Sequence, residues 1–173
     1  MACTLTTGRK LPCKTGFGGV KKIYFVDFGT LGTVTIDADG TISAFAGSPV
    51  FFEFDVKGNS SLESTVNSSR ENGTTFFSQT INVTLPFLDN ATQQELQLIC
   101  VSRPHVVVED YLGNQFLCGI ENGCEVTGGT IVTGAAAGDL YGFTLVLEGQ
   151  EEKAPAFIDA GVLSASATQI SPN

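Results

Sequence analysis

The amino-acid sequence predicts a mainly β protein: an antiparallel β-sandwich or barrel with one packed α-helix and a long polar hairpin. Apolar residues alternate with small polar ones over most of the chain, and one segment near residue 90 has helical spacing. The long helices that connect parallel strands are missing from the pattern. A length of 173 residues suits one domain with its own core. We expect a basic arm at residues 1–22, a β-sandwich domain at 23–159 and a polar tail at 160–173.

The first predicted strands, residues 33–36 and 41–45, form a hairpin. The turn between them ends in Asp39-Gly40, a pair that tolerates the positive φ angles of a tight turn. Residues 50–57 form the next strand, and its core face carries Phe52, Phe54 and Val56. Its other face, expected to be wet, carries Phe51, Glu53, Asp55 and Lys57.

Residues 57–73 are rich in Gly, Asn and Ser, so this segment cannot supply a core of its own. It is either a flexible loop, which is the default for a segment of this length, or an extended hairpin that becomes ordered against a partner. A strand at residues 77–85 follows, with apolar side chains on one face at Phe77, Ile81, Val83 and Leu85. The residues of this segment that we expect to meet a neighbour are Lys57, Asn59, Glu63, Arg70 and Glu71.

One helix is expected at about residues 90–102. Thr92 and Glu95 have the spacing of a capping box, and Pro104 ends the helix. Asp89 and Asn90 suit the amino end of this helix, where the helix dipole is positive. The positions at helical spacing are Leu96, Ile99, Cys100 and Arg103.

After the helix the pattern predicts a meander of strands at residues 105–110, 115–120 and 124–127. The glycine- and alanine-rich residues 128–138 are expected to be a connection with at most a short strand. Residues 140–148 form the last strong strand, whose apolar face carries Tyr141, Phe143, Leu145 and Leu147. The tail beyond it either frays or adds an edge contact.

No catalytic or metal-binding pattern stands out, so we expect no enzyme and no cofactor. Cys100, His105 and Glu109 can be drawn as a nucleophile constellation, but we expect Cys100 to pack on the apolar side of the helix. Cys118 and Cys124 face each other across a predicted turn, as a disulfide or by chance rather than as metal ligands. The odd number of cysteines, with Cys3 and Cys13 completing the five, favours reduced and partly buried thiols.

Charge is strongly segregated along the chain. Residues 1–22 carry five cations and no acid, whereas the rest carries four cations against 18 carboxylates, a net charge of −14 with His105 neutral. An acidic body repels nucleic acid, and a basic arm can lie on the acidic surface of another copy. This favours a subunit of an assembly over a catalyst. The cations of the arm are Arg9, Lys10, Lys14, Lys21 and Lys22.

Other classes of protein fit the composition less well. No apolar run approaches the roughly 20 residues that cross a bilayer, so we expect no membrane span. The polar residues 1–7 lack a signal-peptide pattern, and we expect synthesis in a cytoplasm. The chain has no Trp and three Tyr, which argues against a carbohydrate-binding module, because sugar platforms use exposed aromatic rings.

The order of these elements resembles that of tail tube proteins of tailed bacteriophages and of their relatives in contractile injection machines. The likeness covers about residues 20–158, and the opening Met1–Arg9 also looks like the start of phage virion proteins. The elements that carry it are the strand 50–57, the polar hairpin 57–77, the strand 77–85, the capped helix 92–101 and the closing strand 140–148.

The resemblance implies a virion protein, made in the host cytoplasm, whose subunits form rings, usually hexameric, that stack into a hollow tube. Its partners would be itself and other virion proteins, and DNA would pass through without specific binding. The hairpin would reach a neighbouring ring, the arm would bind an adjacent acidic face, and Glu53 and Asp55 are candidate lumen acids. The long arm and residues 128–138 depart from this layout. They leave a head–tail connector, ring or auxiliary capsid protein as the alternative.

Overall fold

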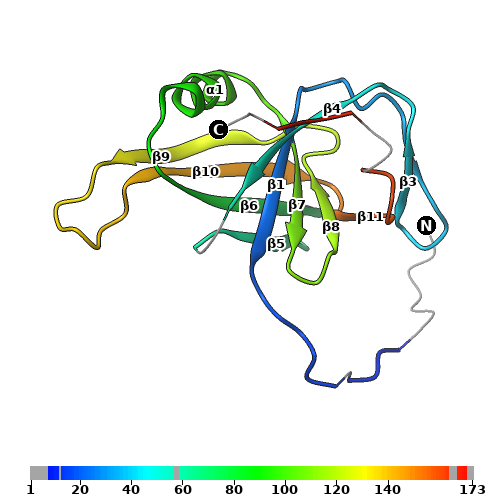
Figure 1. Ribbon diagram of the computed structural model, residues 1–173. Helices are drawn as coiled ribbons and strands as arrows, with labels where there is room; N and C mark the ends of the chain where they lie inside the picture. Colours follow the sequence, from blue (N-terminus) through cyan, green and yellow to red (C-terminus); the bar gives the residue numbers. More distant parts are fainter. Residues whose placement is uncertain (1–7, 12, 57–58, 164–166, 171–173) are drawn as a thin grey trace.

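The computed structural model describes residues 8–11, 13–56, 59–163 and 167–170, and within them it shows two β-sheets and one helix (Figure 1). The predicted β-sandwich with a single helix is therefore confirmed. The described part of the chain holds no helix with the length and hydropathy needed to cross a lipid bilayer.

The larger sheet, sheet A, has the strand order β12-β4-β1-β7-β8-β11-β3-β2. Its strands are β1 (Val20–Val26), β2 (Val34–Ile36), β3 (Ile42–Phe45), β4 (Val50–Asp55), β7 (His105–Asp110), β8 (Gln115–Cys118), β11 (Ala156–Ile158) and β12 (Ala167–Ile170). Strand β1 lies inside the sheet, antiparallel to both β4 and β7. It begins within the range predicted for the arm, so Lys21 and Lys22 are residues of the sheet.

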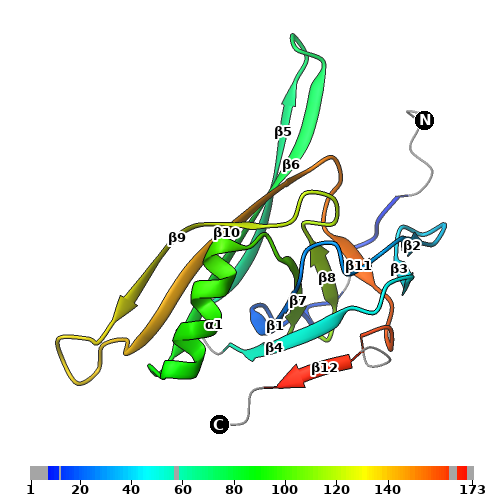
Figure 2. The ribbon, with the colours of Figure 1, turned by 90° about the horizontal axis from the view of Figure 1, so that it is seen from above.

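The smaller sheet, sheet B, has the order β5-β6-β10-β9, and every neighbouring pair is antiparallel. Its strands are β5 (Ser61–Ser69), β6 (Thr74–Pro86), β9 (Glu125–Val132) and β10 (Gly142–Glu151). The β5–β6 hairpin projects from the body on one side, and the β9–β10 hairpin extends in another direction (Figure 2). The helix α1 (Asn90–Val101) lies beside β9 and β10.

Sheet A is buried on both faces around β1, which explains an error in the predicted faces of β4. Ile23 and Phe25 point into the core shared with sheet B and α1, while Tyr24 points into a second core on the opposite face. Phe51, expected on a wet face, is fully buried in this second core. Strands buried on both faces read as continuous apolar runs, so alternation alone cannot find their two sides.

The long polar hairpin of the predicted fold is confirmed, and the flexible loop that was the default alternative for residues 57–73 is wrong for the described part of this segment. Strands β5 and β6 pair residue by residue from Ser61 opposite Asn82 to Ser69 opposite Thr74. Gly73, with φ of 64°, makes the turn at the tip. This segment is polar because both faces of the hairpin are in contact with solvent, and a polar sequence does not prevent the two strands from pairing. Lys57 lies outside the described residues.

One further expectation needs correction. Residues 128–132 belong to strand β9 and not to a connection. Gly129 is paired with Leu145 of β10, and a Cβ on Gly129 would stand 2.6 Å from the backbone carbonyl oxygen of Thr144. Glycine is therefore needed at a place where it would ordinarily weaken a strand. For the tail, the expected edge contact is present, since β12 pairs in parallel with β4 at the edge of sheet A.

The helix has the predicted range but a different cap. Asp89, not Thr92, is the N-cap: its carboxylate accepts hydrogen bonds from the Thr92 backbone N–H at 2.7 Å and from the Thr92 hydroxyl at 2.9 Å. Leu96 and Ile99 are buried as expected, whereas Cys100 is exposed.

His105 connects the loop after β1 to the end of β8. Its Nε2 accepts a hydrogen bond from the Gly29 N–H at 3.1 Å, so Nδ1 carries the proton and donates to the Gly119 carbonyl at 2.5 Å. The ring is buried and stacks on Phe28 at 5.1 Å between centroids, with the Arg103 guanidinium 4.8 Å from the Phe28 centroid. Burial lowers the pKa of His105 below its usual range.

This arrangement predicts a pH-dependent stability. Because the pKa of His105 is lower in the folded state than in the unfolded state, its contribution is fully present above about pH 6.5 and is lost as the pH falls below that value. We expect the urea midpoint of the wild-type chain to fall between pH 7.5 and pH 5.5. The chain has one histidine. A His105→Gln variant should be less stable by about 1–3 kcal/mol at pH 7.5 and should lack this decline. An equal decline in both chains would contradict the assignment.

Candidate assembly surface

The two faces of sheet B differ sharply. Its inner face enters the main core through Ile81, Val83 and Leu85 of β6 and through Phe143, Leu145 and Leu147 of β10. On β6 the outer face carries Ser78, Thr80, Asn82 and Thr84, all half-buried. Two of these polar side chains are held in place: Ser78 donates to Glu148 at 2.8 Å and Thr84 donates to the Asn59 carbonyl at 3.1 Å. The predicted alternation of residues 77–85 is confirmed.

Three carboxylates form a row across the outer face of sheet B. Glu63 of β5 pairs with Thr80 of β6, Thr80 pairs with Glu148 of β10, and Glu148 pairs with Glu125 of β9. Residues paired across a sheet share a face, so the three side chains lie on one line perpendicular to the strands. We call Glu63, Glu125 and Glu148 the acidic row. Glu63 and Glu125 are exposed, and Glu148 is half-buried.

No cation balances the acidic row within its own sheet. The sequences of β5, β6, β9 and β10 contain no lysine and no arginine. Their fourth acid, Glu151, is buried and accepts hydrogen bonds from the backbone N–H groups of Glu121 and Asn122 at 3.0 and 2.8 Å. All charge on the outer face of sheet B is therefore negative.

Both edges of sheet B are open. Strand β5 is bonded only to β6 and strand β9 only to β10 within the described residues, so each has one unpaired side. These edge strands are nine and eight residues long. Long free edges are templates for pairing with another chain, and the short edge strands of sheet A, three and four residues, offer much less.

The residues predicted to reach a neighbour lie along the projecting hairpin. Glu63 is in β5, Arg70 and Glu71 are at the tip, and all three are exposed. Asn59 is exposed just before β5. The hairpin thus brings together the described members of this predicted set, and it places Glu63 in the acidic row.

The candidate lumen acids predicted from the sequence lie elsewhere, on β4 of sheet A. The Glu53 side chain is 10% exposed and is hydrogen-bonded by the Lys22 ammonium, a contact that raises the pKa of Lys22. Asp55 is 78% exposed and lies 4.0 Å from the Lys22 Nζ atom. Glu53 is therefore largely neutralised within its own chain, unlike the acidic row.

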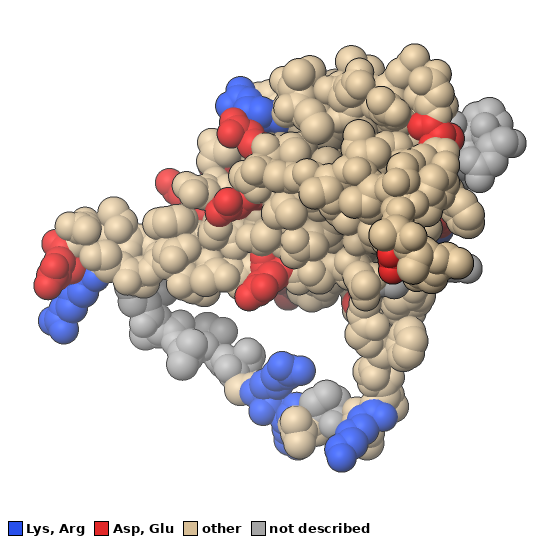
Figure 3. Space-filling view, turned by 90° about the vertical axis from the view of Figure 1, so that its left-hand side faces the viewer, with Lys and Arg blue, Asp and Glu red and all other residues tan. Residues whose placement is uncertain are grey.

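The five predicted arm cations divide into two groups. Lys21 and Lys22 pair with acids of their own body, Lys21 with Glu109 at 3.5 Å. Arg9, Lys10 and Lys14 are exposed on a segment that stands off from the body (Figure 3). The same view shows carboxylates spread over the body. Three cations are therefore free to meet another surface.

The constellation of Cys100, His105 and Glu109 is not assembled as a nucleophile and base. Both ring nitrogens of His105 are engaged by the backbone of other residues, and Glu109 accepts hydrogen bonds from Tyr24 at 3.2 Å and Gln115 at 3.1 Å. Burial raises the pKa of the Tyr24 hydroxyl, and the carboxylate of Glu109 adds to that shift.

The buried cysteines are free thiols. Cys118 and Cys124 are not joined in a disulfide, and burial raises the pKa of both, that of Cys124 to about 12. Cys13 and Cys100 are free and exposed, while Cys3 lies outside the described residues. The described residues contain no group of three or more His, Cys, Asp or Glu that is arranged to hold a metal ion.

No protein-family model matches this chain, and neither the curated proteins nor the solved structures contain a significant match. The function is therefore argued from the surface itself. Two members of the acidic row, Glu125 and Glu148, were not among the residues singled out from the sequence. The signal for Glu148 was present: Leu147 faces the core, so its neighbour in the strand must face outward.

Proposed function

We propose that this chain is a structural subunit that assembles with copies of itself into rings, which stack into the tail tube of a virion like those of tailed bacteriophages. The observation that carries the proposal is sheet B, which combines two long open edges with an outer face that has three carboxylates and no cation.

The strand directions of sheet B suit a head-to-tail ring. Successive strands are antiparallel, and the sheet has an even number of them, so β5 and β9 run in opposite directions. When identical subunits are related by rotation, β9 of one copy meets β5 of the next as an antiparallel pair. Head-to-tail interfaces of this kind close into rings when the rotation closes. The four strands of each copy then continue one antiparallel sheet around the ring, and closure removes every open edge of that sheet.

In such a ring the acidic row of each copy faces the inner wall. When β9 is paired along its length with the neighbour's β5, the two copies are staggered along the strands, so the acidic rows recur around the wall as steps and do not join end to end. An anionic wall without cations repels the phosphate backbone, which lets DNA pass without binding. In this arrangement the acidic row, and not Glu53 or Asp55, lines the lumen.

The arm supplies contacts between rings in this proposal. Arg9, Lys10 and Lys14 are free, the body they would meet is acidic, and the segment that carries them makes few contacts with its own body. The nearest anchor is Phe17, whose ring meets that of Tyr111 at 5.1 Å. Attraction between exposed charges weakens with salt, so stacking through the arm should be sensitive to ionic strength.

The ring itself is tested by electron microscopy and sedimentation of the purified chain over a range of concentrations. We expect closed rings of uniform diameter that stack at high concentration. The paired variants Ser64→Pro and Thr65→Pro in β5 form an internal control. Successive N–H groups of a strand point to opposite sides, so one proline removes a bond to β6 and the other blocks only the open edge. The proline that blocks only the open edge should leave the stability of the monomer unchanged and should prevent the formation of rings.

Two results would contradict the ring. A chain that stays monomeric at every concentration and salt would have no self-assembly to explain. A chain that stops at dimers would use a two-fold contact between like edges instead of a head-to-tail one.

The lumen is tested by reversing the acidic row. The variant Glu63→Lys, Glu125→Lys and Glu148→Lys should make assembled particles retain DNA at low salt, with retention falling steeply as salt rises. A control with the same change in net charge replaces Asp37, Asp39 and Glu152, which are exposed outside sheet B, by lysine. We expect much weaker retention for the control. Equal retention by the two variants would show that position on sheet B does not matter.

The role of the arm is tested by deleting residues 1–14, which keeps Phe17 and all of β1. We expect an unchanged urea midpoint, intact rings, and stacking that is weaker and less sensitive to salt than in the full chain. A full-length variant with Arg9→Gln, Lys10→Gln and Lys14→Gln should behave in the same way if charge is the cause. Undiminished stacking of both proteins would remove the arm from the interface.

A further inference from the structure

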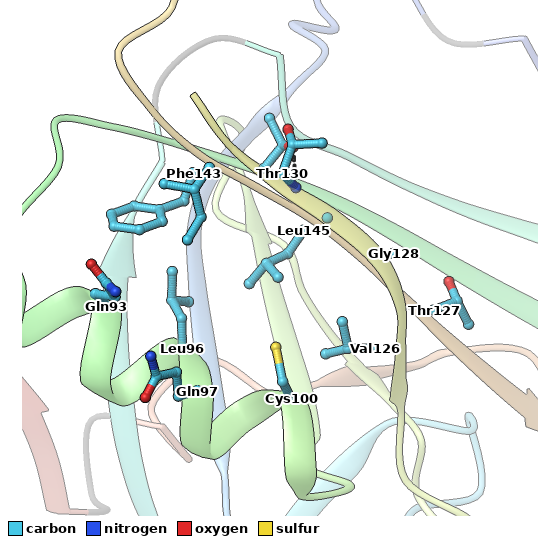
Figure 4. Close-up of a pocket in the computed structure, with 13 residues that line it drawn as sticks. Gln93, Leu96, Gln97, Cys100, Val126, Thr127, Gly128, Thr130, Phe143 and Leu145 are labelled. Atoms are coloured by element: carbon cyan, nitrogen blue, oxygen red, sulfur yellow. Dashed lines mark hydrogen bonds between the residues drawn. The ribbon is translucent and has the colours of Figure 1, made fainter. Parts of the chain in front are cut away.

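An apolar groove lies between α1 and the strands β9 and β10 (Figure 4). Leu96 and Cys100 point into it from the helix, and Val126 and Leu145 point into it from the sheet. Its volume is about 370 Å³, and none of the residues lining it is charged. Ile131, which also lines the groove, is 61% exposed. The groove therefore leaves apolar surface in contact with water beside an open sheet edge.

The projecting hairpin carries apolar surface of the complementary kind. Val66 of β5 is 57% exposed and is paired with the half-buried Phe77 of β6. Phe77 lies on the same face of β6 as the core residue Ile81, so Val66 is on the inner face of sheet B. Here the inner face extends beyond the body, and Val66 is largely uncovered.

Strand alternation connects the two surfaces. Ile131 of β9 is paired with the core residue Phe143, so the groove is on the inner side of sheet B at the β9 edge. Val66 is on the inner side at the β5 edge. In a sheet that continues from one copy to the next, the inner faces of all copies lie on the same side of the sheet. Pairing the full length of β9 with the full length of the neighbour's β5 sets the middle of one strand opposite the middle of the other, so Val66 lies beside Thr127, Gly128 and Gly129, which line the groove.

We propose that Val66 of one copy occupies the α1–β9 groove of the next copy in the ring, an inference that rests on the proposed head-to-tail assembly. The inner side of the hairpin near it, Leu62, Ser64 and Val66, is uncharged, as the groove is. A slip of one residue would turn Glu63 toward this apolar groove, at the cost of burying an unpaired carboxylate. The groove thus specifies which face of the hairpin meets the neighbour.

Cys100 provides a native reporter inside the groove. In a background with Cys3→Ser and Cys13→Ser, a Val66→Cys variant that is assembled and then oxidised should form disulfide-linked dimers and longer ladders on non-reducing gels. Adding Cys100→Ser should abolish them. An Asn67→Cys variant, whose thiol is on the other face of β5, should not cross-link to Cys100.

A second readout needs no change at Val66. Maleimide labelling of Cys100 in the Cys3→Ser and Cys13→Ser chain should be complete in monomers and lost in assembled rings, because the neighbour's hairpin covers the thiol. Rings with a freely labelled Cys100, or with cross-links from Asn67→Cys in place of Val66→Cys, would overturn the groove assignment and leave the ring standing. A chain that forms no rings under the microscope would overturn the proposed assembly, and the groove assignment with it.

Discussion

The strict alternation of side chains across sheet B is the constraint on which the rest of this molecule depends. Each strand must place apolar residues in the core, as Leu145 and Leu147 do, and the residues between them are then forced to the outside. Glu148 can be an outward-facing acid only because Leu147 is inward. A shift of one residue would bury the acidic row and expose the core, so the buried face fixes the position of the outer charges.

The same sheet carries an energetic conflict that the proposed ring must resolve. Closing the ring brings together copies that each carry a net charge of −9, and their repulsion opposes assembly. Two contributions favour assembly. Backbone hydrogen bonds form along two edges of nine and eight residues, and Val66 and Ile131, both more than half exposed in the single chain, become buried. Screening by salt weakens the repulsion within a ring but also weakens the attraction between arm and body. Ring formation and ring stacking should therefore respond to salt in opposite directions.

Much of the fold could be predicted from the sequence, and the failures have physical causes. The helix and the strand at residues 77–85 were found because each has one apolar and one polar face. Strand β1 was not predicted, since its two lysines interrupt the alternation, and they are retained there because Glu53 and Glu109 pair with them across the sheet. Of the acidic row, Glu63 was singled out within the polar hairpin. Its alignment with Glu125 and Glu148 depends on the pairing of strands far apart in the chain, which no local pattern specifies.

The most direct measurement is hydrogen exchange of the backbone amides in the free and the assembled chain. Head-to-tail pairing predicts that outward-facing amides of β5 and β9 exchange fast in the monomer and that both sets become protected together on assembly, while the amides of β6 and β10 change little. Assembled particles in which either edge strand continues to exchange at its monomer rate would contradict a sheet that continues from copy to copy.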